Sequence, residues 1–143
     1  AGSETIHAIS FGDADATTNL VVGAQHHIYT VLSTIVYVVS IGTAGDYYDL
    51  VINGHDHHGG ADSNATPIRI ARVVAVALET FVFNDKFSFN GFGAVNYVEP
   101  MNTAAEQVLI AAQGGTVQKY QIMPYDSDVD VDVTVTFIDQ NNA

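Results

Sequence analysis

The sequence predicts an all-β chain that folds as a two-sheet antiparallel β-sandwich of jelly-roll type. Residues 28–41 form a run without charge, Gly or Pro that is rich in β-branched and aromatic residues, as in strands. Residues 128–137 alternate strictly between Val or Phe and polar residues, the period of a strand with one buried face. Turn signals recur roughly every ten residues, which predicts about eight to ten strands.

Composition limits the organisation and the partners of the chain. Its 143 residues predict one domain, 1–143, that buries a sizeable core. The formal charge of −12 at pH 7 repels phosphate backbones and anionic lipid, so we expect no nucleic-acid and no membrane partner. Cysteine is absent, which removes disulfides, thiolate ligands and cysteine nucleophiles.

The chain before the long run is predicted to hold one strand, a polar loop and a corner. Residues 4–11 form the first strand, which ends at Gly12 and Asp13, and a polar loop follows. Residues 20–22 are a short apolar segment. Gly23 and Ala24 then make a small-residue corner, which we expect to redirect the chain between the two sheets.

The run 28–41 is predicted to be the central strand, because apolar residues occupy both of its faces. A straight strand of this length would extend about 46 Å, whereas a compact chain of this size is about 37 Å across. We therefore expect the strand to bend near Ser33 and to cross from one sheet to the other. Residues 42–46 turn the chain, and residues 47–53 return as its hairpin partner.

The middle of the chain combines a long polar loop with two further strand regions. Residues 54–66 are almost free of apolar side chains, and such a length indicates exposure or function. Residues 68–78 are predicted as a strand with Arg69 and Arg72 on opposite faces. Residues 81–89 are predicted as a hairpin with a tight Asn-Asp turn.

The stretch 103–113 leaves two alternatives open. Thr103 and Glu106 have the spacing of a capping box, which favours one short helix. The alternative is a strand over residues 107–112 that a Gly-Gly turn joins to a strand over residues 116–123.

The set His55, Asp56, His57 and His58 is the densest group of metal-ligand side chains. Imidazole and carboxylate suit zinc, nickel or copper, and we take His55, His57 and His58 as candidate zinc ligands. An extended backbone brings only alternate residues together, so a further ligand must come from elsewhere, such as the histidine pair 26–27. A solvated polar loop and a pH-responsive element are the alternatives.

Asp128, Asp130 and Asp132 lie on one face of the predicted last strand. Carboxylates on alternate residues are candidate calcium ligands, although the segment lacks the Gly and the Glu of an EF-hand loop. Screening of these charges by solvent is the alternative interpretation.

The sequence predicts no enzyme. The Gly-x-Ser-x-Gly, His-Glu-x-x-His, P-loop and Gly-x-Gly-x-x-Gly motifs are missing. Carbohydrate binding would need exposed aromatic side chains, yet the chain has no Trp, and buried positions in the sheets are the other interpretation for its tyrosines. The tyrosines concerned are Tyr47, Tyr48, Tyr97, Tyr120 and Tyr125.

One pattern resembles a known family. In residues 20–28, Leu-Val-Val-Gly-Ala-Gln-His-His-Ile leads into the long strand. After the turn at 43–46, residues 47–54 read Tyr-Tyr-Asp-Leu-Val-Ile-Asn-Gly. This order is similar to the small, jelly-roll-like β-sandwich decoration or cement proteins of tailed-phage virions, in which a Gly-containing corner precedes a long strand and then a short strand ending in Asn-Gly or Asp-Gly. The pattern covers residues 20–97 and departs from the family where residues 54–66 are inserted.

The resemblance implies a non-enzymatic structural protein on the virion surface. It implies a homo-oligomer, with a trimer favoured, that contacts the major capsid protein or another virion protein. The apolar strand surface of the chain exceeds what one small sandwich hides, which agrees with contacts between subunits. The alternative is a secreted or surface module, located outside the cell, that binds carbohydrate or calcium.

Overall fold

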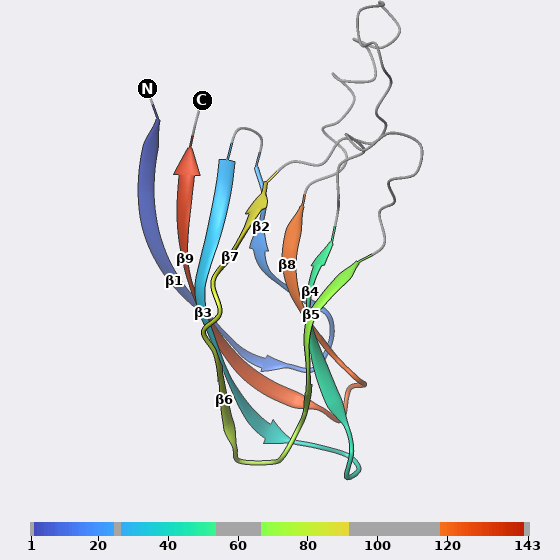
Figure 1. The fold of residues 1–143 in the computed structure, drawn as a ribbon. Helices are drawn as coiled ribbons and strands as arrows, with labels where there is room; N and C mark the ends of the chain where they lie inside the picture. The colour runs from blue at the N-terminus through green and yellow to red at the C-terminus, as the bar shows by residue number, and fades with distance from the viewer. Residues whose placement is uncertain (1, 25–26, 54–66, 92–117, 142–143) are drawn as a thin grey trace, which may run out of the picture.

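The computed structural model describes residues 2–24, 27–53, 67–91 and 118–141. These segments form nine strands in two antiparallel sheets that pack face to face (Figure 1). The predicted all-β sandwich is therefore confirmed. The described residues include no helix that is long and apolar enough to cross a membrane.

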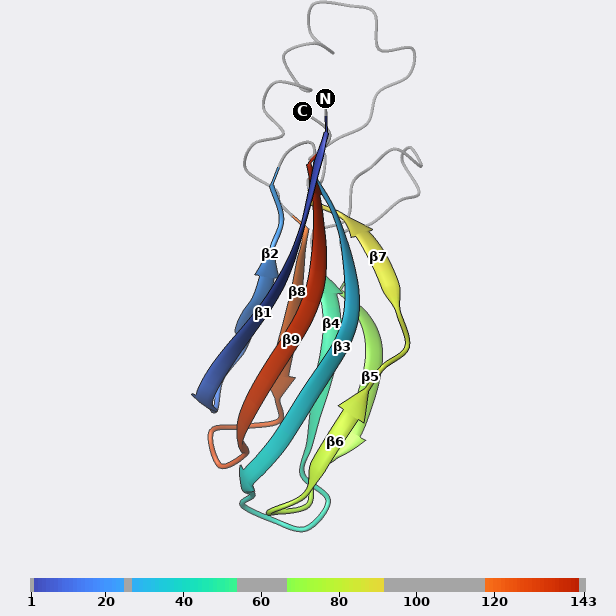
Figure 2. The same ribbon diagram turned by 90° about the vertical axis from the view of Figure 1, so that its left-hand side faces the viewer.

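The five-stranded sheet, called sheet A, contains the two ends of the described chain. Its order is β1-β9-β3-β6, and β7 also pairs with β3. Figure 2 shows β1, β9 and β3 side by side as long, curved strands. The bounds are Ser3–Ala14 for β1, Asp130–Asn141 for β9, His27–Ser40 for β3, Thr80–Phe83 for β6 and Phe87–Asn90 for β7.

The four-stranded sheet, called sheet B, has the order β2-β8-β4-β5. Its strands are shorter: β2 spans Thr18–Val22, β8 Lys119–Pro124, β4 Tyr47–Asn53 and β5 Ile68–Val74. The chain passes repeatedly between the sheets. β6 and β7 pair with different parts of the same edge of β3, so together they count as one strand position. Counted in this way, the sandwich has the eight-strand arrangement of a jelly roll.

The corner at Gly23 behaves as predicted, since β2 belongs to sheet B and β3 to sheet A. A Cβ atom at Gly23 would collide with the backbone carbonyl oxygens of Gly91 and Gln118, so only glycine fits there. The predicted end of β1 at Gly12 is wrong. A β-bulge between Phe11 and Ala14 lets the strand continue past it.

The long strand β3 bends where predicted but does not change sheets. Its pairing with β9 shifts register between Val31 and Ser33, which makes Leu32 the extra residue of a β-bulge. After the bulge, the odd-numbered residues of β3 lie on the outer face instead of the inner face. Val31 is therefore fully buried, whereas Ile35 is half-exposed. Pairing with β9 nevertheless continues to Ser40, so the bend curves the strand within sheet A.

Two predicted hairpins are wrong. β4 does not pair with β3 but lies in sheet B, because the turn that follows β3 carries the chain across the sandwich. The Asp46 carboxylate stabilises this turn by accepting hydrogen bonds from the Gly42 and Thr43 amides at 3.0 and 2.9 Å. β6 and β7 both run antiparallel to β3 along one edge, so they follow one another instead of folding back as a pair.

The core lies between the sheets and confirms the predicted alternation of β9. Its inward residues Val131, Val133, Val135 and Phe137 are buried, whereas Asp132 is exposed. Sheet B contributes buried side chains from β4 and β8. The largest of these are Tyr48, Leu50, Tyr120 and Ile122.

Candidate functional site

The predicted histidine ligands His55, His57 and His58, with Asp56, lie outside the described residues, as does the stretch 103–113. Their metal binding therefore stays a prediction.

His27, from the flanking pair, has partners of its own. Its Nδ1 atom lies 2.6 Å from Asp139 Oδ1, and its ring stacks on Tyr29 with a centroid distance of 5.9 Å. This contact joins the start of β3 to the end of β9. The structure thus gives His27 a role within the sheet.

The predicted aspartate row begins in the turn before β9 and continues onto the outer face of sheet A. The Asp128 amide donates to Asp126 Oδ1 at 2.9 Å. Asp132 Oδ1 accepts from the Asp13 amide at 3.0 Å, next to the bulge of β1. Among the described residues, no group of three or more His, Cys, Asp or Glu side chains could hold a metal ion. Calcium binding by Asp128, Asp130 and Asp132 stays a prediction.

Asp130 has the least favourable environment for a charged carboxylate in this row. Its Oδ1 atom is buried and has no hydrogen-bond partner. Burial raises the pKa of the Asp130 carboxyl above its ordinary value, and the charges of Asp13, Asp15 and Asp132 raise it further. The four carboxylates therefore repel one another at neutral pH.

An ion-pair cluster occupies the outer face of sheet B. Asp49 is buried, and Arg72 donates to both of its oxygens, from Nε at 2.8 Å and from Nη2 at 2.9 Å. Arg69 Nε lies 3.3 Å from Asp49 Oδ2. The hydrogen bond from Arg72 holds the pKa of the Asp49 carboxyl below its ordinary value, and the two positive charges add to this effect.

The cluster corrects the prediction that Arg69 and Arg72 lie on opposite faces of β5. Leu50 pairs with Ala71 while Val51 pairs with Arg69, so Ile70 is the extra residue of a β-bulge. The bulge restores both arginines to one face.

Aromatic rings extend the ion-pair cluster. The Arg72 guanidinium lies 3.9 Å from the centroid of the Tyr47 ring, and the Tyr47 and Tyr125 rings are 4.9 Å apart. Tyr48 and Tyr120 are fully buried, so they offer no sugar platform. Tyr97 lies outside the described residues.

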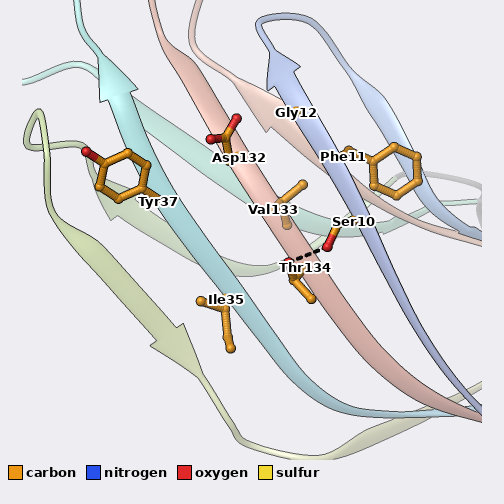
Figure 3. A pocket seen from close by; sticks show the side chains of 8 residues that line it. All are labelled: Ser10, Phe11, Gly12, Ile35, Tyr37, Asp132, Val133 and Thr134. Atoms are coloured by element: carbon orange, nitrogen blue, oxygen red, sulfur yellow. Dashed lines mark hydrogen bonds between the residues drawn. The ribbon is translucent and has the colours of Figure 1, made fainter.

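A shallow depression of about 330 Å³ lies on the outer face of sheet A (Figure 3). Half-exposed Ile35 and Tyr37 stand on one side of it, and Ser10 Oγ and Thr134 Oγ1 form a hydrogen bond of 2.7 Å on the other. Sequence periodicity missed this site, because the bulge at Leu32 moves Ile35 to the outer face. The lining residues are Ser10, Phe11, Gly12, Ile35, Tyr37, Asp132, Val133 and Thr134.

Three lining residues of the depression, Ser10, Thr134 and Ile35, belong to a larger surface of three cross-strand rows, which we call the uncharged rows. Strand registers place the members of each row opposite one another, and none carries a formal charge. Several are well exposed, with Ile6 at 69%, Val82 at 52% and Ile35 at 40%. The rows are Ile6-Ile138-Thr30-Ser88, Ala8-Thr136-Ser33 and Ser10-Thr134-Ile35-Val82.

Fold and sites together define a two-sheet antiparallel β-sandwich with a jelly-roll order of strands and three uncharged rows on the outer face of sheet A. No family model matches the chain, and no curated protein matches it.

Solved structures show a distant likeness in overall shape. A structure of Bacillus endospore appendages, a family of disulfide-linked pili, has a TM-score of 0.41 at 10% identity over 99% of this chain and 89% of its own. The Drosophila NLP core, studied for pentamer formation and histone binding, has 0.41 at 7% identity over 92% and 96%. The extra small virus of the prawn Macrobrachium rosenbergii has 0.39 at 9% identity over 99% and 80%. These values assign neither a family nor a function to the chain.

Proposed function

We propose that this chain is a non-enzymatic structural protein of a phage particle, a decoration or cement subunit that contacts other copies and the major capsid protein at the virion surface. The uncharged rows on sheet A carry the proposal. Although the chain has a formal charge of −12, these rows contain no charged side chain. Another protein can therefore cover them without the cost of desolvating charged groups.

The exposed side chains of these rows suit a protein–protein contact. Ile35 and Val82 are directly opposite one another in the register of β3 and β6, so their side chains form a continuous apolar patch. The hydroxyls of Ser10 and Thr134 form one hydrogen bond of 2.7 Å, so one of their two O–H donors is already satisfied within the sheet. A monomer seldom leaves such surface uncovered.

The polar clusters elsewhere in the described chain stabilise the sheets. Asp49 is held by two arginines, and His27 is held by Asp139. Neither arrangement leaves a nucleophile or a general base facing open space beside a second reactive group. A scaffold whose function depends on its surface is consistent with both clusters.

The test of the proposal combines sedimentation velocity with cosedimentation on expanded capsids of a tailed phage. We expect the wild type to form trimers and to sediment with the capsids. Ile35→Lys places a charge within the uncharged rows and should abolish binding, whereas Val22→Lys on β2 of sheet B should bind as the wild type does. A strictly monomeric protein that stays in the supernatant would refute the proposal.

The depression favours a second candidate, a carbohydrate- or calcium-binding module outside the cell. Tyr37 presents a half-exposed ring beside the Asp132 carboxylate and two hydroxyls, the groups that sugar hydroxyls and a calcium ion contact. A glycan array with and without chelator tests it. Binding that Tyr37→Ala removes would support this candidate, and a negative array in both conditions would exclude it.

A further inference from the structure

The first half of β1 is an arm that the sandwich does not cover. All six residues from Ser3 to Ala8 are exposed, although their side chains alternate between the two faces of the strand. The inward side chain of His7 stacks on Phe137, with a centroid distance of 5.2 Å, and its Nε2 atom lies 2.9 Å from the exposed Thr5 Oγ1. Within the described chain, the ladder with β9 is the only strand pairing of this arm.

The other edge of β1 lacks the usual protection against further pairing. β1 is the last strand of sheet A, and its register with β9 is regular from Ser3 to Phe11 (Figure 2). That stretch contains no Pro and no Lys, and the β-bulge comes only after Phe11. Exposed edges of this length and regularity are templates for a further strand.

We propose that this edge pairs antiparallel with β1 of a second copy, so that two sheets A become one continuous sheet. The inference rests on the proposed function, which requires copies of the chain to associate. It adds that β1 of each copy forms a contact between them. Pairing over the whole regular stretch from Ser3 to Phe11 places the two-fold axis at His7. The contact is isologous, so it can also link one trimer to the next.

This register is self-complementary. It sets Glu4 opposite Ser10, Thr5 opposite Ile9, and Ile6 opposite Ala8 of the second copy. Glu4 is the only residue in the stretch with a formal charge, so no like charges meet across the strands. The Ile6–Ala8 pairs join side chains of the same face, so the uncharged rows that begin at Ile6 and Ala8 of one copy continue into those of the next.

Cysteine cross-linking tests the register, because the natural chain has no cysteine. Opposite residues in an antiparallel ladder have Cα atoms about 4.5 to 5.5 Å apart, within the range that a disulfide bridges. We expect His7→Cys to form mostly disulfide-linked dimers under mild oxidation. Val22→Cys, which is also exposed but lies on β2 of sheet B, should stay largely monomeric on a non-reducing gel.

A charge pair at the same position measures the contact without a covalent bond. His7→Lys sets two ammonium groups opposite one another and should raise the dissociation constant at least tenfold in sedimentation velocity. The neutral His7→Thr should stay within about twofold of the wild type. Thermal melts of both variants show whether β1 still pairs with β9.

The outcomes separate this inference from the proposed function. Copies that associate while His7→Cys stays unlinked and His7→Lys has no effect would overturn edge pairing and leave the proposed function intact. Linked His7→Cys dimers without capsid binding would support edge pairing and refute the proposed function.

Discussion

At the scale of single residues, buried polar groups and their partners contribute to the stability of this small sandwich. Asp49 keeps its charge although it is buried, because two arginines contact its carboxylate. Thr34 and Tyr120 form a hydrogen bond of 2.8 Å inside the core, where both side chains are fully buried. Burial raises the pKa of Tyr120 to about 12, although the bond with Thr34 lowers it, so the phenol stays neutral.

Asp49→Asn should lower the free energy of unfolding at neutral pH by about 1 to 2 kcal/mol, since both arginines are partly exposed and solvent screens the pairs. The depressed pKa of Asp49 stabilises the fold above the ordinary carboxyl pKa of 3.8, and this stabilisation is lost as the pH falls through the folded value. Urea melts of wild type and variant should therefore converge in strong acid. Asp85→Asn, in the exposed segment between β6 and β7, is the control, and a difference between wild type and Asp49→Asn that persists in acid would contradict the assignment.

Thr34→Val should cost roughly 1 to 3 kcal/mol, because it leaves the Tyr120 hydroxyl buried without a partner. Tyr120→Phe should have a similar cost, because it leaves the Thr34 hydroxyl buried without a partner. The double variant should lose less than the sum of the two, since neither polar group remains. Urea denaturation of all four proteins measures this coupling, and strict additivity would show that the bond contributes little.

At the scale of elements, β-bulges explain most differences between prediction and structure. Periodicity correctly located the strands 28–41, 47–53 and 128–137, because each has a clear apolar pattern. One extra residue at Leu32 or at Ile70 reverses the faces that follow. The sequence predicts the bend near Ser33 but not the change of faces, and it does not predict the bulge at Ile70 at all. The wrong hairpins have another cause, since partners in a jelly roll are set by contacts between distant segments.

Gly23→Ala tests the corner between the sheets. Because a Cβ atom would collide with two backbone carbonyl groups, the variant should lose roughly 3 kcal/mol or more, or fail to accumulate as folded protein. Gly12→Ala is the matched control, because its Cβ atom would meet only the Asp132 carboxylate at an ordinary 3.7 Å. Equal melting temperatures for the two variants would contradict this account of the corner.

At the scale of the whole molecule, the acidic net charge and the uncharged rows have opposite effects on self-association. The formal charge of −12 repels a second copy at long range, whereas the uncharged rows and the free edge of β1 favour contact at short range. The sequence alone predicted the acidity and the sandwich. It could not predict the face, because that surface exists only once distant strands lie side by side.

Added salt should therefore strengthen self-association. Raising the ionic strength from about 0.01 M to about 0.1 M shortens the Debye length from about 30 Å to about 10 Å, which weakens the repulsion and leaves the apolar contacts in place. Sedimentation equilibrium should show a lower dissociation constant at the higher salt. Association that weakens with salt would mean that ion pairs hold the copies together.

The divided edge of β3 has a kinetic consequence. β7 pairs with Ile28–Val31 and β6 with Thr34–Tyr37, while the bulge leaves Leu32 opposite no residue of β9. Within the described chain, Leu32 therefore lacks a ladder partner on either side. We expect its amide to exchange with deuterium faster than the amides of Val31 and Val36, although all three lie in the same strand. On the timescale of local opening, the longest strand of the molecule behaves as two short strands that meet at Leu32.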